Sequence, residues 1–435
     1  MTRPVFSSRA AVLLTMIGVS VGLGNVWRFP YMMGQYGGSA FLVIYLLLTL
    51  AFAIPALTAE WALGRATRSG PIGAFSHAFG RVPGRVIGTI LLITILVADS
   101  YYVVIIANIV YAAGFTVLRG FDGSGMADYQ AGLQNGVLQY ALALALMASS
   151  LYVIHRGLRR GIEVVSRWFV PFFLIVIVWL VISAFRLDGA LDHMTEFLKP
   201  DFSAIGAEEI FAALGQSFFS VGLGGTFMLV YGSYLGDKEH LLPDAAVTAF
   251  GDTAAAVLAA LFIVPTVLVF GLDMSTGPGL VLETLPQLFA NLAGGRWLGG
   301  LFLLALAMVA FLSNIAALEV LVRGAEDFGG KATGRDRVIV IVALVQAPLI
   351  ALSAFRPEVI AILDMIFGSG MQVMGSLMTL LALTWGLGKR ETLKQVFPQG
   401  EGAFPGFYFH WVRWVVPGAL LVILLLYLRS VFTGQ

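Results

Sequence analysis

Long runs of apolar residues dominate the chain, and only isolated polar positions interrupt them. A helix needs about 20 apolar residues to cross the hydrocarbon core of a bilayer. Eleven runs approach or exceed that length. Apolar residues continue through each run instead of alternating with polar ones, so we expect helices and not the strands of a membrane barrel. The runs lie near residues 10–33, 39–64, 86–118, 137–154, 162–185, 206–235, 242–271, 297–322, 336–354, 358–387 and 408–432.

Composition points to the same class of protein. Soluble domains are about 45–50% apolar and about 25% charged, whereas this chain of 435 residues is 59% hydrophobic and 12% charged. So few charges could not cover a water-facing surface. The net charge of +1 gives no indication of a nucleic-acid partner, and the absence of cysteine excludes disulfides and thiolate metal sites. The prediction is a polytopic membrane protein in a lipid bilayer.

Lysine and arginine indicate the orientation. If the N-terminus is cytoplasmic, the cytoplasmic segments contain the great majority of the 26 basic residues, as the positive-inside rule requires. Arg3 and Arg9 precede an apolar run, as in a signal peptide, but Asn25 and Arg28 interrupt that run and no small-residue cleavage site follows. We therefore expect an uncleaved first span, and a cytoplasmic loop at the charged, glycine- and proline-containing stretch 389–410.

A short repeat marks two of the runs. The sequence SVGLG occurs at residues 20–24 and again at 220–224, in the first and sixth runs. Five spans separate the copies, so they point in opposite directions through the membrane. Each glycine costs about 1 kcal/mol in a helix interior, and paired glycine-interrupted spans mark the binding site of secondary transporters. Close helix packing through small residues is the alternative interpretation.

A helix broken inside the membrane offers two kinds of binding group. Amide N–H groups become free on one side of the break and carbonyl groups on the other. The amides attract a carboxylate, and the carbonyls attract an ammonium group or Na⁺. A zwitterionic amino acid together with Na⁺ would satisfy both sets. Asn25 and Arg28 follow the first break directly, and polar residues at membrane depth are functional by default.

The residues around the first break identify a family. Residues 18–30, GVSVGLGNVWRFP, strongly resemble the first-span signature of neurotransmitter:sodium symporters, above all the bacterial amino-acid transporters with the leucine-transporter fold. Further matches are EWALGR at 60–65, Tyr101-Tyr102, GQSFFS at 215–220 and YGSY at 231–234. The resemblance covers about residues 3 to 430.

The resemblance implies an architecture and a location. We expect a single all-α transporter domain over residues 1–435, with a five-helix repeat at 10–186, an inverted second repeat at 206–387 and an additional helix at 408–432. Helices 1 and 6 would be the broken ones. The expected location is the cytoplasmic (inner) membrane of a bacterium, as a monomer or weak homodimer, and no enzymatic activity is expected.

The resemblance also implies the substrate contacts. The amides of Leu23 and Gly24 and the Tyr102 hydroxyl would bind the substrate carboxylate. The carbonyls for the substrate ammonium group would be those of Ser20, Phe219, Ser220 and Gly222. The matching side-chain pocket positions are Ala98, Gly222, Gly225 and Ala317. In family members that carry monoamines, an aspartate stands where this chain has Gly22, so the substrate here is expected to bring its own carboxylate.

One or two sodium ions are expected from the same comparison. The first site would use Ser20, Asn25, Ser220 and Asp252. Asp252 stands where the family has asparagine, and its fixed negative charge would replace the chloride that other members bind near residues matching Tyr45, Gln216 and Ser220. Transport is therefore expected without chloride, with proton coupling left open.

The second sodium site is incomplete in this sequence. Its expected ligands are carbonyls and one hydroxyl, from Gly18, Val21, Val309 and Ser313. The family has two adjacent hydroxyls where this chain has Leu312-Ser313, so one oxygen is missing. Either Asn314 or water substitutes, or the site is absent and a single sodium ion is transported.

Charged pairs would close the two sides of the transport path. The resemblance implies an outer gate of Arg28 and Asp364 above an aromatic lid of Tyr102 and Phe219. It implies an inner gate of Arg3 and Asp327, which Tyr234 and Glu319 would join. Charges solvated at the membrane edge are the alternative for the inner pair.

Four small residues in the pocket, with apolar walls, favour a bulky neutral L-amino acid such as tryptophan, phenylalanine, tyrosine, leucine or methionine. If neighbouring side chains refill that space, a small substrate is expected instead. The alternative function is a sodium- or proton-coupled carrier of the same fold for another small zwitterion or osmolyte. A channel is disfavoured, because the polar residues cluster at one depth instead of lining a continuous path.

Overall fold

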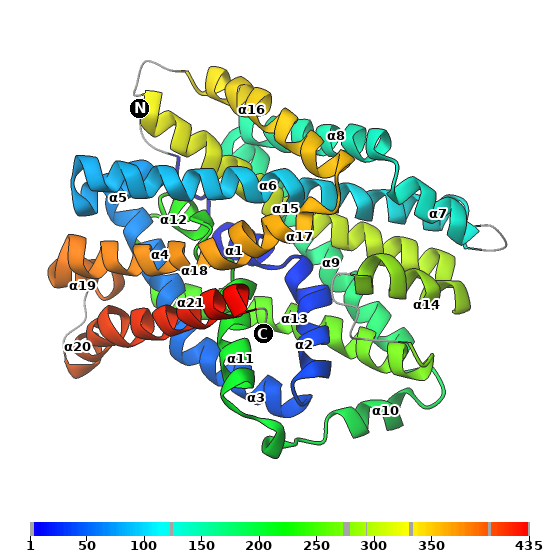
Figure 1. Ribbon diagram of the computed structural model, residues 1–435. Helices are drawn as coiled ribbons and strands as arrows, with labels where there is room; N and C mark the ends of the chain where they lie inside the picture. Colours follow the sequence, from blue (N-terminus) through cyan, green and yellow to red (C-terminus); the bar gives the residue numbers. More distant parts are fainter. Residues whose placement is uncertain are drawn as a thin grey trace.

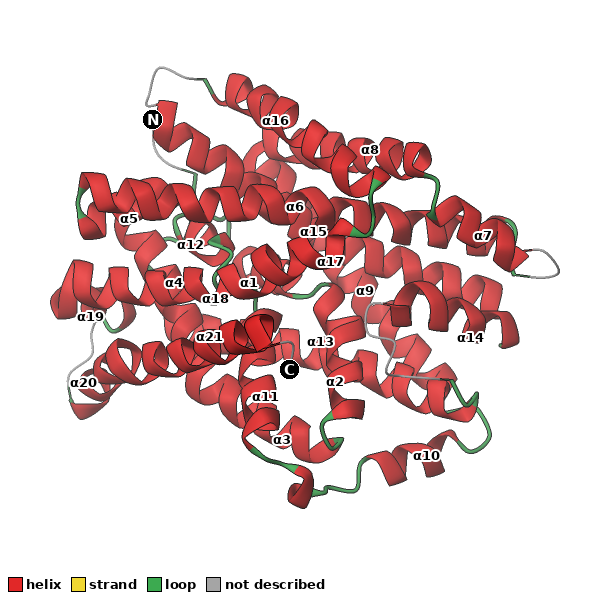
Figure 2. Cartoon of the chain, viewed as in Figure 1, coloured by secondary structure: helices red, strands yellow, loops and turns green. Residues whose placement is uncertain are grey.

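The protein is entirely helical in the part that the structure describes. This computed structural model describes residues 4–121, 125–272, 279–292, 294–329, 334–398 and 402–433, and their regular elements are all helices (Figure 2). Nine of these helices are long and apolar enough to cross a membrane. A tenth span is the pair Arg9–Ser20 and Gly24–Gln35, which bends by 60° at a short break. The all-α prediction is confirmed.

The unbroken spans follow the predicted order. Their helices are α3 (Ser39–Leu48) with α4 (Ile54–Thr67), α6 (Arg81–Leu118), α8 (Gly136–His155), α9 (Glu163–Ala184), α13 (Leu241–Val269), α15 (Gly295–Gly329), α16 (Arg335–Phe355), α17 (Val359–Leu363) with α18 (Met371–Leu381), and α20 (Ala403–His410) with α21 (Val416–Thr433). Short π-helical turns join the segments within several of these spans. Shorter helices connect them: α5 (Pro71–Phe79), α7 (Gly125–Leu133), α10 (Ala190–Phe197), α14 (Leu285–Asn291) and α19 (Gly388–Val396).

Two expectations need adjustment. The predicted run 206–235 is divided into α11 (Ala207–Ser220) and α12 (Phe227–Gly232), and each is too short to span a bilayer alone. The count of eleven spans is therefore not confirmed by helix length. The stretch predicted as a cytoplasmic loop is largely helical, because α19 runs to Val396 and α20 begins at Ala403.

The two breaks differ in their backbone. Helix α1 (Arg9–Ser20) ends because Val21 adopts an extended conformation, with φ −67° and ψ 121°. After α11, the backbone instead enters the left-handed region at Gly222 (φ 69°), Gly224 (φ 82°) and Thr226 (φ 55°). Glycine adopts such angles without a steric penalty, so the glycines of the second break are needed for its conformation.

Helices α1 and α12 lie near the centre of the view in Figure 1, below the long helix α6. Helix α1 contacts α9, α13 and α15, and α12 contacts α4 and α15. Unbroken helices therefore hold both breaks in place from several sides.

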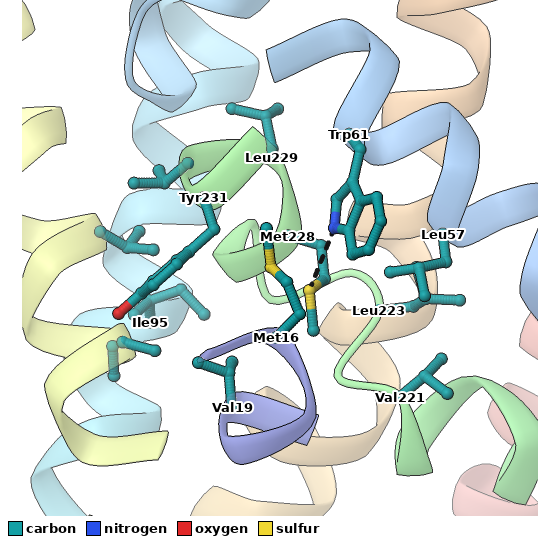
Figure 3. Close-up of a cluster of buried hydrophobic side chains, with 14 of the residues drawn as sticks. Met16, Val19, Leu57, Trp61, Ile95, Val221, Leu223, Met228, Leu229 and Tyr231 are labelled. Atoms are coloured by element: carbon teal, nitrogen blue, oxygen red, sulfur yellow. Dashed lines mark hydrogen bonds between the residues drawn. The ribbon is translucent and has the colours of Figure 1, made fainter. Parts of the chain in front are cut away.

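A buried cluster fixes α12 against α4 and α1 (Figure 3). The Trp61 indole N–H donates to the Met228 sulfur at 3.4 Å, and Met16 lies beside Met228. Close backbone packing adds to this contact, since a Cβ atom on Gly64 would stand 1.9 Å from the Leu229 carbonyl oxygen. Helix α12, the second half of this broken helix, is thus packed closely against α4.

Candidate substrate- and sodium-binding site

A cavity of about 700 Å³ opens between the two helix breaks. It is bounded by the first span, by α6, by the break between α11 and α12, and by α15 and α17. The predicted site residues that line it are Ser20, Gly22, Leu23, Gly24, Asn25, Arg28, Ala98, Tyr102, Phe219, Ser220, Gly222, Ser313, Ala317 and Asp364. The same cavity therefore brings together residues that lie almost 350 positions apart in the sequence.

The breaks touch one another at this cavity. The Ser20 hydroxyl donates to the Val221 carbonyl at 3.4 Å. A Cβ atom on Gly22 would stand 3.4 Å from both the Tyr102 hydroxyl and the Ser313 hydroxyl, and on Gly24 it would stand 2.6 Å from the Phe219 ring. In the first break, then, Gly24 is needed for space, whereas Gly22 makes only an ordinary contact distance. The Tyr102 hydroxyl also lies within hydrogen-bonding reach of the Leu23 backbone, so a side chain and the start of a half-helix converge on one point.

Three predicted ligands of the first sodium ion form one buried hydrogen-bonded group. The Asn25 side-chain amide donates to Asp252 Oδ1 at 2.8 Å, to the Asp252 carbonyl at 3.1 Å and to the Ser220 hydroxyl at 3.3 Å. The Ser220 hydroxyl donates to Asp252 Oδ2 at 2.5 Å. Asp252 is fully buried. A carboxylate, an amide and a hydroxyl are oxygen donors of the kind that hard cations take.

Residues matching the family's chloride position lie next to this group. The Tyr45 hydroxyl is within hydrogen-bonding reach of Ser220 and within electrostatic range of Asp252. Gln216 is fully buried, and neither polar atom of its side-chain amide has a partner in the described part of the chain. The buried carboxyl group of Asp252 therefore lies close to the place that the sequence comparison assigns to a chloride ion.

The expected second sodium site is partly apolar. A Cβ atom on Gly18 would stand 2.7 Å from a methyl group of Leu312, so this leucine lies between the first span and α15. The Ser313 hydroxyl donates to the Val19 carbonyl at 3.2 Å. Val21, directly after α1, and Val309 of α15 belong to one buried hydrophobic cluster. Hydrocarbon from Leu312 therefore stands where the family has a hydroxyl group.

The outer gate residues lie apart from one another. The Arg28 guanidinium lies 4.4 Å above the Phe219 ring. Asp364 Oδ1 accepts a hydrogen bond from the Tyr101 hydroxyl at 2.9 Å. Among the ion pairs of the described residues there is none between Arg28 and Asp364, although both line the cavity. Asp364 lies within electrostatic range of Arg28 across this cavity.

The residues predicted for the inner gate lie near a larger polar network than the sequence indicated. Arg3 lies outside the described residues, and Asp327 accepts hydrogen bonds from the Gly73 amide at 2.8 Å and the Gly70 amide at 3.4 Å. The Tyr234 hydroxyl donates to Glu319, as expected, and Arg335 at the start of α16 donates to the same carboxylate at 2.7 Å. Arg335 also pairs with Glu326 at 3.1 Å.

The cavity lining differs from the predicted pocket at Gly225 and includes residues that the sequence interpretation did not name. Gly225 does not line the cavity, because the ring of Phe227 lies against it and would stand 2.0 Å from an added Cβ atom. Phe227 lines the cavity in its place. Asp99, a buried carboxyl group beside Ala98, was also overlooked, although a lone acidic residue inside the apolar stretch 91–109 is a usable signal.

Comparison with known proteins supports the family suggested by the motif. A family model, the sodium:neurotransmitter symporter family, matches residues 3–119 and 124–433. The chain belongs to this family. It is therefore a multi-pass membrane protein of a family of sodium-dependent transporters.

Relatives of this symporter family cover almost the whole chain. An uncharacterized sodium-dependent transporter of Bacillus subtilis, YhdH, is 29% identical over 97% of both chains. Another of Methanocaldococcus jannaschii, MJ1319, is 30% identical over 75% of this chain and 70% of its own. The crystal structure of MhsT in complex with L-phenylalanine superposes with a TM-score of 0.86 at 26% identity, covering 97% of this chain and 99% of that one. The leucine-transporter fold is thus confirmed.

Proposed function

We propose that this protein is a symporter that couples the uptake of a bulky neutral L-amino acid to sodium by alternating access. The observation that carries the proposal is the cavity between the two helix breaks, which joins an amide-rich point at Leu23 and Tyr102 to the buried group of Asn25, Ser220 and Asp252. An anionic and a cationic group can therefore be bound side by side.

The amino-acid backbone would bind across the breaks. Its carboxylate takes the amides of Leu23 and Gly24 and the Tyr102 hydroxyl, where the start of a half-helix favours negative charge. Its ammonium group takes carbonyls at the ends of the first half-helices, from Ser20, Phe219, Ser220 and Gly222. Gly22 leaves no carboxylate on the protein at this point, so the substrate supplies its own.

The pocket walls favour a large apolar side chain. Ala98, Gly222 and Ala317 line the cavity, and they leave room that an apolar side chain would fill. Phe227 reduces this room on the side of α12. The similar transporter MhsT was solved with L-phenylalanine, which agrees with an aromatic or large aliphatic substrate. Because the walls are largely apolar, a charged side chain would lose its hydration there.

The first sodium ion would bind Asn25, Ser220, Asp252 and the Ser20 carbonyl. Asp252 balances its charge, so transport proceeds without chloride. The substrate carboxylate would lie against the same ion, so each ligand is expected to strengthen the binding of the other. Ion and substrate together neutralise a site that water cannot reach once the Arg28–Asp364 gate has closed.

The gates and the orientation complete the proposal. Closure of Arg28 onto Asp364 seals the outside, and opening of the network around Glu319 and Arg335 releases the cargo inside. We assign the repeats to residues 10–186 and 206–387, and the N-terminus to the cytoplasmic face of a bacterial inner membrane.

The test is uptake into proteoliposomes that contain the full-length protein. We expect an inward sodium gradient to drive accumulation of labelled phenylalanine or leucine, with unlabelled tryptophan, tyrosine and methionine competing. Glycine, alanine and an osmolyte such as glycine betaine should compete weakly. Strong competition by those small compounds, with none by the aromatic amino acids, would refute the substrate class.

A further inference from the structure

A buried carboxylate in the membrane interior lacks a positive partner. Asp99 is 2% exposed in the middle of α6. Its Oδ1 accepts the Asn314 side-chain amide at 2.7 Å, and its Oδ2 accepts the Gln346 side-chain amide at 2.8 Å. The ion pairs of the described residues do not include it. An uncompensated charge at this depth is costly, so a cation that binds there would relieve the cost.

The surroundings of Asp99 are rich in oxygen. The Ser150 hydroxyl donates to Asn314 Oδ1 at 2.6 Å. The Gln346 side-chain oxygen has no hydrogen-bond partner in the described part of the chain, although Gln346 is 0% exposed. Rotation of a side-chain amide exchanges its N–H₂ for its oxygen. Asp99, Ser150, Asn314 and Gln346, which we call the Asp99 cluster, can thus turn up to five oxygens toward a common point.

We propose that the Asp99 cluster binds the second sodium ion of the transport cycle, a role that rests on the proposed function. Carboxylate, amide and hydroxyl oxygens are ligands for hard cations. The cluster contains a single carboxylate, which balances one positive charge. A divalent ion would leave one charge uncompensated in the membrane interior, so a monovalent ion fits better.

Two observations connect this cluster to the transport site. Asp99 and Ser313 both line the central cavity, which gives an ion a route to the cluster. Asn314 directly follows Ser313 on α15, so the cluster lies one residue along from the expected second site. There, Leu312 places a methyl group against Gly18 where the family has a hydroxyl. The ion site has moved from the face of α15 that contacts α1 to the side that contacts α6 and α16.

The proposal also gives a role to both buried aspartates near the helix breaks, Asp99 at the cavity and Asp252 beside Asn25 and Ser220. Asp252 serves the first ion, and Asp99 serves the second. Each sodium ion then has one carboxylate of its own, and the loaded site is neutral apart from the zwitterionic substrate. Binding at Asp99 would turn the amides of Asn314 and Gln346 and so tighten α6 against α15 and α16, beside Tyr102.

The test counts sodium ions on the purified full-length protein in the absence of any amino acid. We expect ²²Na⁺ binding to saturate at two ions per wild-type chain and at one ion in Asp99→Asn, which keeps the shape and removes the charge. Asp244→Asn is the matched control, because Asp244 is an equally buried acid that pairs with Arg9 away from the cavity. This control should retain two ions.

A second variant covers the case that Asp99→Asn does not fold. Gln346→Leu keeps the carboxylate, and it should weaken the affinity for one of the two ions by about tenfold or more. Two ions at unchanged affinity in either variant would overturn the proposal. The proposal would also be overturned if Asp99→Asn still bound two ions but no longer released a proton that the wild type releases on binding sodium. The cluster would then hold a proton and not an ion. Failure of amino-acid uptake would refute the proposed function and leave the ion count standing.

Discussion

Replacing Asp252 by asparagine tests how the first sodium site balances its charge. The substitution preserves the shape of the side chain and keeps one oxygen beside Asn25 and Ser220. It removes the negative charge that accepts the Ser220 hydroxyl at 2.5 Å and the Asn25 amide at 2.8 Å. A sodium ion held by the same neighbours would lie within about 4 Å of that charge.

The magnitude follows from Coulomb's law. Two unit charges about 4 Å apart attract by about 4 kcal/mol at an effective dielectric constant of about 20. Since about 1.4 kcal/mol corresponds to a tenfold change in affinity, the upper limit is a loss of about 1000-fold. The remaining amide oxygen and rearranged water offset part of this, so we expect Asp252→Asn to bind sodium between about 10- and 1000-fold more weakly.

Chloride provides the discriminating condition. Tyr45, Gln216 and Ser220 remain in the variant, and an anion there would restore the missing negative charge. The assay follows thermal unfolding of the purified protein against sodium concentration, in chloride and in gluconate, because a ligand stabilises the state that binds it. We expect chloride to improve sodium binding by Asp252→Asn and to leave the wild type unchanged. Equal sodium affinity of variant and wild type in gluconate would refute the reasoning.

Three further outcomes are expected. Gly224→Ala should destabilise the protein by more than about 2 kcal/mol in a thermal-unfolding measurement, because its Cβ atom would stand 1.7 Å from a backbone carbonyl of α18 at a φ of 82°. The control Gly215→Ala should be tolerated in the same measurement, because its Cβ atom meets nothing within 4 Å. Tyr102→Phe should weaken amino-acid binding about tenfold or more through loss of a hydrogen bond to a charged group, and an unchanged dissociation constant in a binding titration would contradict that role. Arg335→Met should destabilise the protein by about 3–5 kcal/mol, because it leaves the buried Glu319 without its cationic partner. The double variant Arg335→Met with Glu319→Gln should recover most of the lost stability. A double variant no more stable than Arg335→Met would argue against a buried ion pair.

The order of the spans could be predicted because each membrane helix is encoded by a long apolar run in the sequence. Apolar length is imposed by the bilayer, and the glycine pairs at 20–24 and 220–224 marked both breaks. Helix boundaries were less accessible where polar residues continue a helix into water, as in α19, whose residues Gly388–Val396 read as a loop. Charge and glycine content lower apolarity without forbidding a helix.

The direction of a side chain at a break was harder to predict. The motif placed Gly225 in the pocket, yet the left-handed backbone at Gly224 and Thr226 turns the chain so that Phe227 takes that place. Regular helices allow faces to be assigned from spacing, but a segment without regular dihedrals has no such period. The size of the pocket therefore could not be predicted from residue spacing and had to be taken from the structure.

The hydrogen-bond partners of buried polar residues that are far apart in the chain were the hardest feature to predict from the sequence. Asp99 meets Asn314 and Gln346 across 215 and 247 residues, and each of these residues has an unremarkable local context in an apolar helix. The position of Asp99 within an apolar helix could indicate only that burying a charged side chain there costs free energy. The structure adds that both of its visible partners are neutral, whereas the buried Glu319 of α15 has a charged partner in Arg335. A transporter that must release its ions into the cytoplasm benefits from this difference, because a carboxylate without a permanent cation can take a transported one and give it up again.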